Sequence, residues 1–281
     1  MGARTAVVWL RNDLRLADNP ALAAAAASFT AVAPVFVWSP KDAGAWSPGR
    51  GSRMWLPASL KALSADIAAR GGRLTVLNGP TAEALIGFAH ATGADTVLWN
   101  RRYEPTLAAR DAHVERALVS AGISVRTFAG SLLNEPETIL TRSGGAYQVF
   151  TPYYNAARTR PLEPPLPAPE RLPAPAFVPT GISLRRPAGA KPDVIATFTP
   201  GEAGARLAAE RFFDESVREY DEGRERPDHD GTSRLSPHLA FGEISPRTLV
   251  ARANEVVTCN GECHVAAGAI AFIRQLYWPE F

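Results

Sequence analysis

Long apolar segments, cysteines and lysines are all scarce in this 281-residue sequence. No stretch of about 18 or more uninterrupted apolar residues occurs, which predicts that no helix spans a membrane. The first ten residues are typical of a strand, not of a basic stretch followed by an apolar core, so no secretory signal is indicated. Two cysteines cannot build a disulfide framework, and with no signal segment they predict a reducing, cytoplasmic location.

Metal-binding residues are few as well. Cys259, Cys263 and His264 lie close together, but a fourth ligand and a familiar ligand spacing are missing. We therefore interpret the three as incidental and predict no metal site.

Positive charge is carried almost entirely by arginine, because the chain has only three lysines. The formal net charge is +2, and from Gly201 onward nine arginines stand against fourteen acidic residues. Overall charge thus gives no argument for nucleic-acid binding, and any such argument must come from local residues.

Short apolar runs alternate with helical patterns in the first half of the chain. Strands are predicted over 5–10, 31–38, 73–77, 95–99 and 124–128. Asp18-Asn19-Pro20 and Thr81 are predicted to begin helices with a capping side chain. Pro34 suggests an end or edge of its strand. The alternation predicts an α/β fold with a mainly parallel sheet that helices cover on both faces.

Polar loops directly follow two of these strands, at 11–15 and 100–104. Ligands in such sheets usually lie beyond the carboxyl ends of the strands. The loops are therefore placed for a ligand or a domain contact, and a solvated or internally paired loop is at least as well supported by position alone.

Proline marks the middle of the chain, since eleven of the 24 prolines fall within 161–200. This composition is typical of an extended linker. Beyond it, Phe213, Val217 and Tyr220 recur at helical spacing, and no strand pattern follows. We predict three parts: an α/β domain over 3–133, a linker over 134–200 that is proline-rich from 161, and an all-helical unit over 201–281.

The segment 231–247 contains two Ser-Pro pairs, Ser236-Pro237 and Ser245-Pro246. Each pair predicts a helix that begins with a capping serine and a first-turn proline. Helix N-termini suit phosphate groups, and Thr232, Ser233 and Arg234 add hydroxyl donors and charge. Helix capping alone explains the serines equally well.

The same segment closely resembles the flavin-phosphate motif of the photolyase/cryptochrome family, in the form typical of class I pyrimidine-dimer photolyases. Three other stretches resemble family signatures in the same order: 8–20, 100–105 with 109–111, and 150–153. The resemblance runs from about residue 5 to the end and is weakest across the linker.

The resemblance implies a nucleotide-binding-like α/β domain, a linker and the start of a helical domain that binds FAD. It further implies light-driven repair of UV-damaged DNA by electron transfer from reduced FAD to a flipped cyclobutane pyrimidine dimer, and we expect a monomer. The residues that it assigns to FAD are Tyr220, Thr232, Ser233, Arg234, Leu235, Ser236 and Phe272. Arg224 would contact the DNA backbone, and Gln275 and Trp278 would contact the lesion.

The sequence departs from the family at four places. Gln275 replaces a glutamate common in pyrimidine-dimer photolyases and resembles (6-4) photolyases and animal cryptochromes; Pro279 replaces an arginine. Thr106 and Leu107 replace an asparagine and an acid of folate-binding relatives. These replacements argue against methenyltetrahydrofolate as the antenna pigment. A deazaflavin or no antenna pigment is the alternative.

Phe281 is predicted to lie within a helix, where relatives continue for many more helices. We therefore expect a carboxy-terminally truncated photolyase that alone holds FAD poorly and does not repair DNA. A cryptochrome-like light receptor and an inactive α/β module for a nucleotide or pigment are the alternatives.

Overall fold

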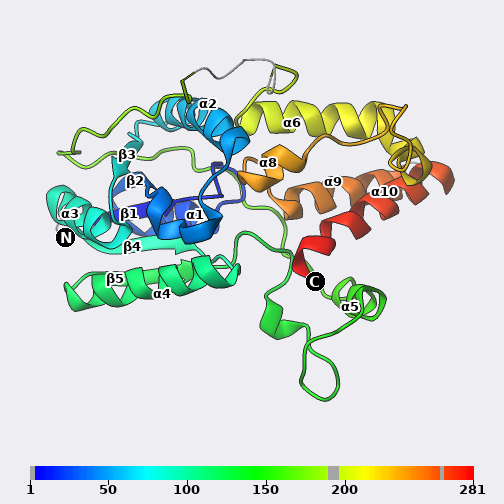
Figure 1. Cartoon of the computed structure of the whole chain (residues 1–281), viewed down its shortest axis with the longest axis horizontal. Coiled ribbons are helices and arrows are strands. Elements are labelled where there is room, and N and C mark those ends of the chain that lie inside the picture. The colour runs from blue at the N-terminus through cyan, green and yellow to red at the C-terminus, as the bar shows by residue number, and fades with distance from the viewer. Residues whose placement is uncertain (1–3, 189–195, 260–262) are drawn as a thin grey trace.

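The structure, a computed structural model, describes residues 4–188, 196–259 and 263–281. Its first part is a parallel sheet (Figure 1). The strands are β1 (Thr5–Leu10), β2 (Ala31–Trp38), β3 (Thr75–Asn78), β4 (Ala94–Asn100) and β5 (Ser124–Phe128), in the order β3-β2-β1-β4-β5. All neighbouring pairs are parallel, so the predicted α/β class is confirmed.

Helices cover both faces of this sheet. They are α1 (Pro20–Ser28), α2 (Arg50–Ala68), α3 (Thr81–Thr92) and α4 (Pro105–Ser120), and a 3-10 helix, Pro40–Trp46, precedes α2. Val8 and Leu10 pack under α1 and α2, whereas Val7 and Trp9 pack under α3 and α4. β1 is therefore buried on both sides, as its uninterrupted apolar sequence requires.

The predicted helix starts are only partly correct. Asn19 caps α1, because its side chain accepts a hydrogen bond from the backbone N–H of Leu22 (3.1 Å). Thr81 is the first residue of α3 and not its cap. The carboxylate of Asp42 instead accepts from both the backbone N–H (2.9 Å) and the hydroxyl (2.5 Å) of Thr81, so a distant segment does the capping.

Pro34 lies in the interior of β2, which is itself an inner strand, so the predicted end or edge position is wrong. Pairing with β3 begins only at Val35, opposite Thr75. Two residues before the proline, the N–H of Val32 points away from β1 and donates to the carbonyl of Pro173 in the linker (2.8 Å). The backbone nitrogen of Pro34, two residues further along the strand, points to the same side as that of Val32. This side is not paired with β3 at Pro34, so the strand loses no ladder hydrogen bond there.

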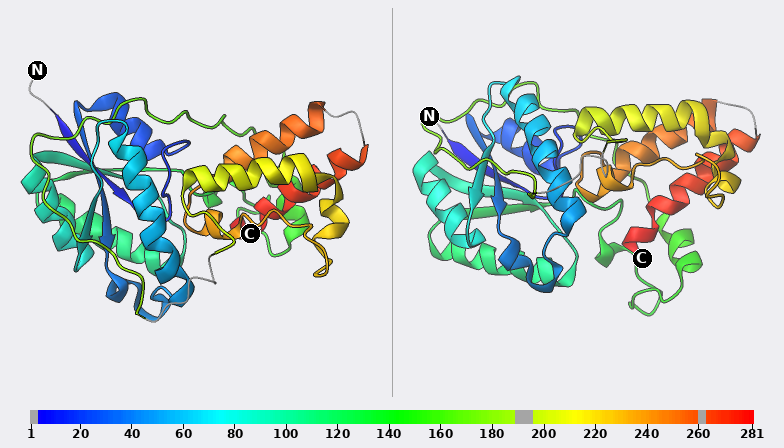
Figure 2. Two further views of the ribbon diagram at one scale, coloured as in Figure 1. Left: turned by 90° about the horizontal axis from the view of Figure 1, so that it is seen from above. Right: turned by 45° about the horizontal axis from the view of Figure 1, so that its top comes forward.

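Among its described residues, the linker region contains a 3-10 helix (Pro136–Thr138) and α5 (Phe150–Ala157), and it forms no regular helix or strand after Thr159. It runs over the α/β part before the chain enters α6 (Figure 2). Backbone hydrogen bonds attach it there, from Leu172 to the carbonyl of Arg70 (2.8 Å) and from Ile182 to that of Val76 (2.7 Å).

The last part consists of helices joined by turns and loops, with no strand among its described residues. Its elements are α6 (Glu202–Arg211), a π-helical turn (Phe212–Ser216), a 3-10 turn (Val217–Glu219), α7 (Tyr220–Gly223), α8 (Ser236–Ala240), α9 (Pro246–Cys259), α10 (Cys263–Leu276) and a 3-10 turn (Trp278–Glu280). Phe150, Tyr153 and Tyr154 of α5 belong to the same hydrophobic core. The side chains of Cys259, Cys263 and His264 lie outside the described residues.

The helix predicted to contain Phe281 ends earlier, because α10 stops at Leu276. Pro279 lacks the N–H that would bond the carbonyl of Gln275, and its ring would clash with that carbonyl. The chain therefore turns into a 3-10 helix at Trp278. Across the described parts of the chain, no helix has both the length and the apolar character needed to cross a bilayer.

Candidate functional site

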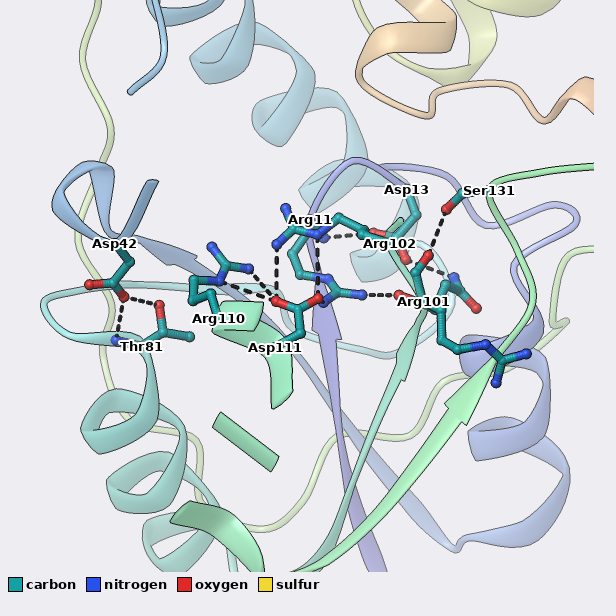
Figure 3. Close-up of polar contacts among 10 residues, drawn as sticks. Arg11, Asp13, Asp42, Thr81, Arg101, Arg102, Arg110, Asp111 and Ser131 are labelled. Atoms are coloured by element: carbon teal, nitrogen blue, oxygen red, sulfur yellow. Dashed lines mark hydrogen bonds and ion pairs between the residues drawn. The ribbon is translucent and has the colours of Figure 1, made fainter. Parts of the chain in front are cut away.

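Three arginines converge on Asp111 at the carboxyl edge of the sheet (Figure 3). Arg11 follows β1, Arg102 follows β4 and Arg110 lies on α4, with nitrogen-to-oxygen distances of 2.5, 3.0 and 2.8 Å. Burial raises the pKa of Asp111, but the attraction of the three guanidinium groups outweighs it, and the pKa is lowered. Asp111 is therefore held as a carboxylate.

Arg11 is itself buried, and its guanidinium lies 4.4 Å from the ring centroid of Trp9. Burial lowers its pKa to about 10, against the opposing attraction of Asp111. A further hydrogen bond runs from Arg11 to the carbonyl of Asn100. The loop at 11–15 was predicted either to contact a ligand or another domain or to be solvated or internally paired. Arg11 is internally paired.

The rest of the first loop is a contact between the α/β part and the helical part. Arg15 donates to the carbonyls of Gly242 (3.1 Å) and Gly130 (2.6 Å), and Leu14 N–H donates to the carbonyl of Phe241 (3.1 Å). Gly242 has φ +64°, and a Cβ there would lie 1.9 Å from the carbonyl oxygen of Asn12. Only glycine permits this approach, so the predicted domain contact is confirmed for this end of the loop.

The predicted flavin-phosphate residues form a tight turn. Arg234 has φ +52°, which is unusual for a residue other than glycine, and Leu235 follows in the right-handed region. Such an alternation directs successive backbone N–H groups into one concavity that suits an anion. Thr232 and Ser236 are exposed, and Ser233 is half-buried.

The two predicted serine caps differ in outcome. The hydroxyl of Ser245 accepts from the N–H of Thr248 (3.0 Å), so Ser245 caps α9 as expected. Ser236 is the first residue of α8, Leu235 occupies the cap position, and no side chain caps this helix. The hydroxyl of Ser236 is therefore not engaged as a cap, contrary to the prediction.

A hollow of about 190 Å³ opens beside this turn. It is lined by Thr232, Ser233 and Arg234 on one side and by residues of α6, including Arg211, on the other. Asp230 pairs with both Arg211 (3.3 Å) and Arg234 (2.8 Å), and all three are exposed. Arg211 also pairs with Glu215 (3.7 Å), so two carboxylates balance the two cations, and the case for an anion rests on the hydroxyl and N–H donors of the turn. The volume suits a diphosphate and not a whole dinucleotide.

The predicted DNA and lesion residues also come together. Arg224, Gln275 and Trp278 line one hollow of about 540 Å³. Trp278 is 48 % exposed and stacks on Phe150, with ring centroids 3.8 Å apart and an interplanar angle of 9°. A fixed, half-open aromatic face is what a flipped base requires. Arg224 pairs with the exposed Glu225 (3.2 Å).

Tyr220 and Phe272, also expected at the flavin, are not among the residues that line either hollow. Each is buried in an aromatic cluster with Phe212. Their ring centroids are 5.5 Å apart in an edge-to-face arrangement. In this structure they support the helical core beneath the two hollows.

A buried polar group that sequence patterns did not indicate connects the two parts of the molecule. Trp55 on α2 donates to one oxygen of Glu243 (2.8 Å), and the other oxygen bonds Nδ1 of His238 (2.5 Å). His238 also lines the hollow beside the turn at Thr232, Ser233 and Arg234. Trp55 and Glu243 are 188 residues apart, so no local pattern could have predicted their contact.

Comparisons with known proteins agree with the sequence resemblance. A family model described as DNA photolyase matches residues 6–172. The chain is 40% identical, over all of its length, to a deoxyribodipyrimidine photo-lyase of Agrobacterium fabrum and covers 59% of that protein. It is 36% identical over 86% of its length to cryptochrome-2 of Arabidopsis thaliana, of which it covers 41%.

Among solved structures, a bacterial class III photolyase from Agrobacterium tumefaciens matches the whole chain with a TM-score of 0.90 and 36% identity. The chain covers 58% of that structure, so it spans about three-fifths of the length of its Agrobacterium relatives. The expected class I subtype finds no support in these comparisons.

Proposed function

Because the chain belongs to the DNA photolyase family, we propose that it forms part of a light-driven flavoprotein that repairs pyrimidine dimers in UV-damaged DNA. One observation carries the proposal: Arg224, Gln275 and Trp278, each assigned to DNA or lesion contact, line the same hollow. The three come from α10, its following turn and the end of α7, so no helix periodicity alone would gather them.

The phosphate turn supports FAD as the cofactor. Its hydroxyls and its arginines, together with the N–H groups around Arg234, are donors for a diphosphate. Thr232, Ser233 and Arg234 would hold these phosphates, with Leu235 and Ser236 at the start of α8. Bound FAD, once reduced and excited by light, would supply the electron that opens the dimer.

The chain's own residues would bind and orient the lesion. Trp278 offers its exposed face to the flipped bases, since every base has a π-face that stacks on an aromatic ring. Gln275 can donate and accept hydrogen bonds at the lesion, but its amide does not supply a proton as a carboxylic acid does. Arg224 would bind a phosphate beside it.

We assign the parts of the chain in the same way: an antenna domain over 3–133, a linker over 134–200 and part of the FAD-binding domain over 201–281. Thr106 and Leu107 on α4 are not typical folate ligands, so a deazaflavin or no antenna fits α4 better than methenyltetrahydrofolate.

A second candidate function is that of a cryptochrome-like light receptor. It is favoured by the 36% identity to cryptochrome-2 and by Gln275, which stands in the hollow where an acid would favour dimer repair. An inactive nucleotide- or pigment-binding module is the third.

Two measurements on the 281-residue chain separate these functions. The absorbance of the purified protein, with FAD added in excess, gives its flavin content, and anisotropy of labelled duplexes compares DNA with and without one thymine dimer. We expect weak flavin retention and tighter binding to the dimer-containing duplex, with the preference abolished by Trp278→Ala. Light-dependent loss of dimers would establish repair itself.

Flavin binding without any preference for damaged DNA would favour the receptor. A chain that binds neither flavin nor damaged DNA would contradict both functions and leave the pigment-binding module.

A further inference from the structure

The hollow proposed for the lesion gathers positive charge in a part of the chain that is otherwise acidic. From Gly201 onward, acidic residues outnumber arginines by fourteen to nine. Yet Arg224 and Arg274 of this part, with Arg158 from the end of α5, line this one hollow, and Asp221 is the one acidic residue among its described lining residues. The local charge is therefore opposite in sign to that of the helical part around it.

Arg158 and Arg274 lie against the same aromatic ring. Their guanidinium carbons are 5.7 and 5.9 Å from the ring centroid of Tyr154. Arg274 is also 5.6 Å from the centroid of Phe150, the ring on which Trp278 stacks. The two cations thus lie beside Tyr154, one of them also beside Phe150, and Trp278 stacks on Phe150.

Neither arginine has a carboxylate partner among the described residues. Within the described parts of the chain, no ion pair involves Arg158 or Arg274, and both residues are exposed. Each lies at the C-terminal end of a helix, where a cation is favourable. That position explains one basic residue on each helix, but not why both turn to the same ring.

We propose that Arg158 and Arg274 bind DNA phosphates next to the flipped lesion and, with Arg224, form a three-arginine clamp around the hollow. The proposal rests on the proposed function for its ligand. A guanidinium beside a ring still has N–H groups for the planar, two-point recognition of a phosphate. Two such groups beside one ring lie close to each other and to Trp278, so they would bind the strand next to the lesion.

The test is the salt dependence of DNA binding. Each phosphate contact to duplex DNA contributes about 0.9 to the slope of the logarithm of affinity against the logarithm of salt concentration. Arg158→Ala and Arg274→Ala should each flatten this slope by about one, and the double variant by about two. Anisotropy with labelled duplexes, with and without one thymine dimer, measures the slope of the full 281-residue chain.

Two sets of variants act as controls. Arg116→Ala removes an exposed arginine from α4, outside the hollow, and should leave the slope unchanged. Arg158→Lys and Arg274→Lys keep the charge and should retain most of the slope, which separates loss of a contact from loss of folding. Because phosphate contacts carry no base information, the preference for damaged DNA should persist in the arginine variants.

Slopes equal to that of Arg116→Ala would overturn the clamp while leaving the proposed function intact, provided the native chain still prefers damaged DNA. Flattened slopes in a chain without that preference would support the clamp and contradict the repair function. A native chain that binds neither duplex would overturn both.

Discussion

Asp111 accepts hydrogen bonds from three guanidinium groups, and their planar shape is what makes this possible. Arg110 bonds the carboxylate along its edge while its face lies 5.0 Å from the ring centroid of Trp9. Arg11 uses the same ring system in a similar way, bonding Asp111 and lying 4.4 Å from that centroid. An ammonium is a compact point charge and has no such edge and face. The near-absence of lysine thus agrees with how this molecule uses its cations.

Glu280 is a half-buried carboxyl group, and we expect it to make stability depend on pH. Burial raises its pKa to about 7, although the N–H groups of Leu133 and Asn134 oppose this. A raised folded-state pKa means that the folded protein binds the proton more tightly than the unfolded chain does. Its contribution is therefore complete below about pH 4.5 and is lost as the pH rises through about 7.

Urea unfolding midpoints measured from pH 4 to pH 8 test this, with Glu280→Gln as the variant. The native chain should lose stability relative to the variant as the pH rises across that window. All other groups that change protonation are present in both proteins, so they cancel in the difference. Exposed Glu255→Gln is the control, and an identical pH profile for Glu280→Gln and the native chain would refute the expectation.

At this scale, local chemistry was predictable from sequence and distant chemistry was not. Asn19 and Ser245 cap helices as predicted, because a cap is decided within three residues. The prediction for Thr81 was wrong because Asp42, folded back from another segment, satisfies the start of α3 instead. Only the family resemblance assigned Gln275 and Trp278 to the lesion. Neither local sequence patterns nor the resemblance indicated Arg158 and Arg274.

Among the elements, α10 depends on a glycine at its closest crossing. Gly268 faces the 3-10 turn at Val217, and a Cβ at Gly268 would lie 1.8 Å from the carbonyl oxygen of Val217. The obstacle is backbone, which cannot turn aside as a flexible side chain can. α10 carries Gln275, and Trp278 follows it, so this crossing determines how far these two residues lie from the helical core.

Two glycine-to-alanine substitutions should therefore act in opposite directions. Gly268→Ala should destabilise the protein by about 1–3 kcal/mol through overpacking. Gly87→Ala should stabilise it by about 0.5–1 kcal/mol, because Gly87 lies inside α3 and a Cβ added there would meet nothing within 4 Å. Thermal unfolding of both variants decides the point. Equal shifts of the same sign would show that helix propensity, and not the crossing, determines the outcome.

Strands and helices were predictable to different degrees along the chain. β1 is buried on both faces, and its apolar run matched its predicted bounds. β3 begins at Thr75, two residues later than predicted, because it pairs only where β2 offers Val35 onward. α10 was expected to continue to Phe281 although Pro279 was visible in the sequence, and proline chemistry alone would have ended the helix before it.

In the whole molecule, Asp18 joins three regions. Its N–H donates to the carbonyl of Leu166 (2.8 Å), and its carboxylate accepts from the N–H of Leu166 (3.1 Å) and from two nitrogens of Arg247 (2.8 and 3.1 Å). The α/β part, the linker and α9 therefore meet at one carboxylate. Its side chain is 1% exposed, so the charge is stabilised by these partners and not by water.

Removing Arg247 should consequently loosen the whole molecule. Arg247→Ala leaves Asp18 as a buried carboxylate without its cation, which costs about 3–5 kcal/mol. The control Arg252→Ala breaks an exposed pair with Glu255 and should cost less than about 1 kcal/mol.

A double variant tests whether the buried charge is the cause. Asp18 has φ +49°, a conformation that asparagine also tolerates, so Asp18→Asn removes the charge without straining the backbone. If the buried charge is the cause, adding Asp18→Asn to Arg247→Ala should recover much of the loss in thermal stability, and protease cleavage within 161–200 should rise in Arg247→Ala and fall again in the double variant. Additive losses in the double variant would instead mean that Arg247 acts through packing alone, and the joint at Asp18 would not be electrostatic.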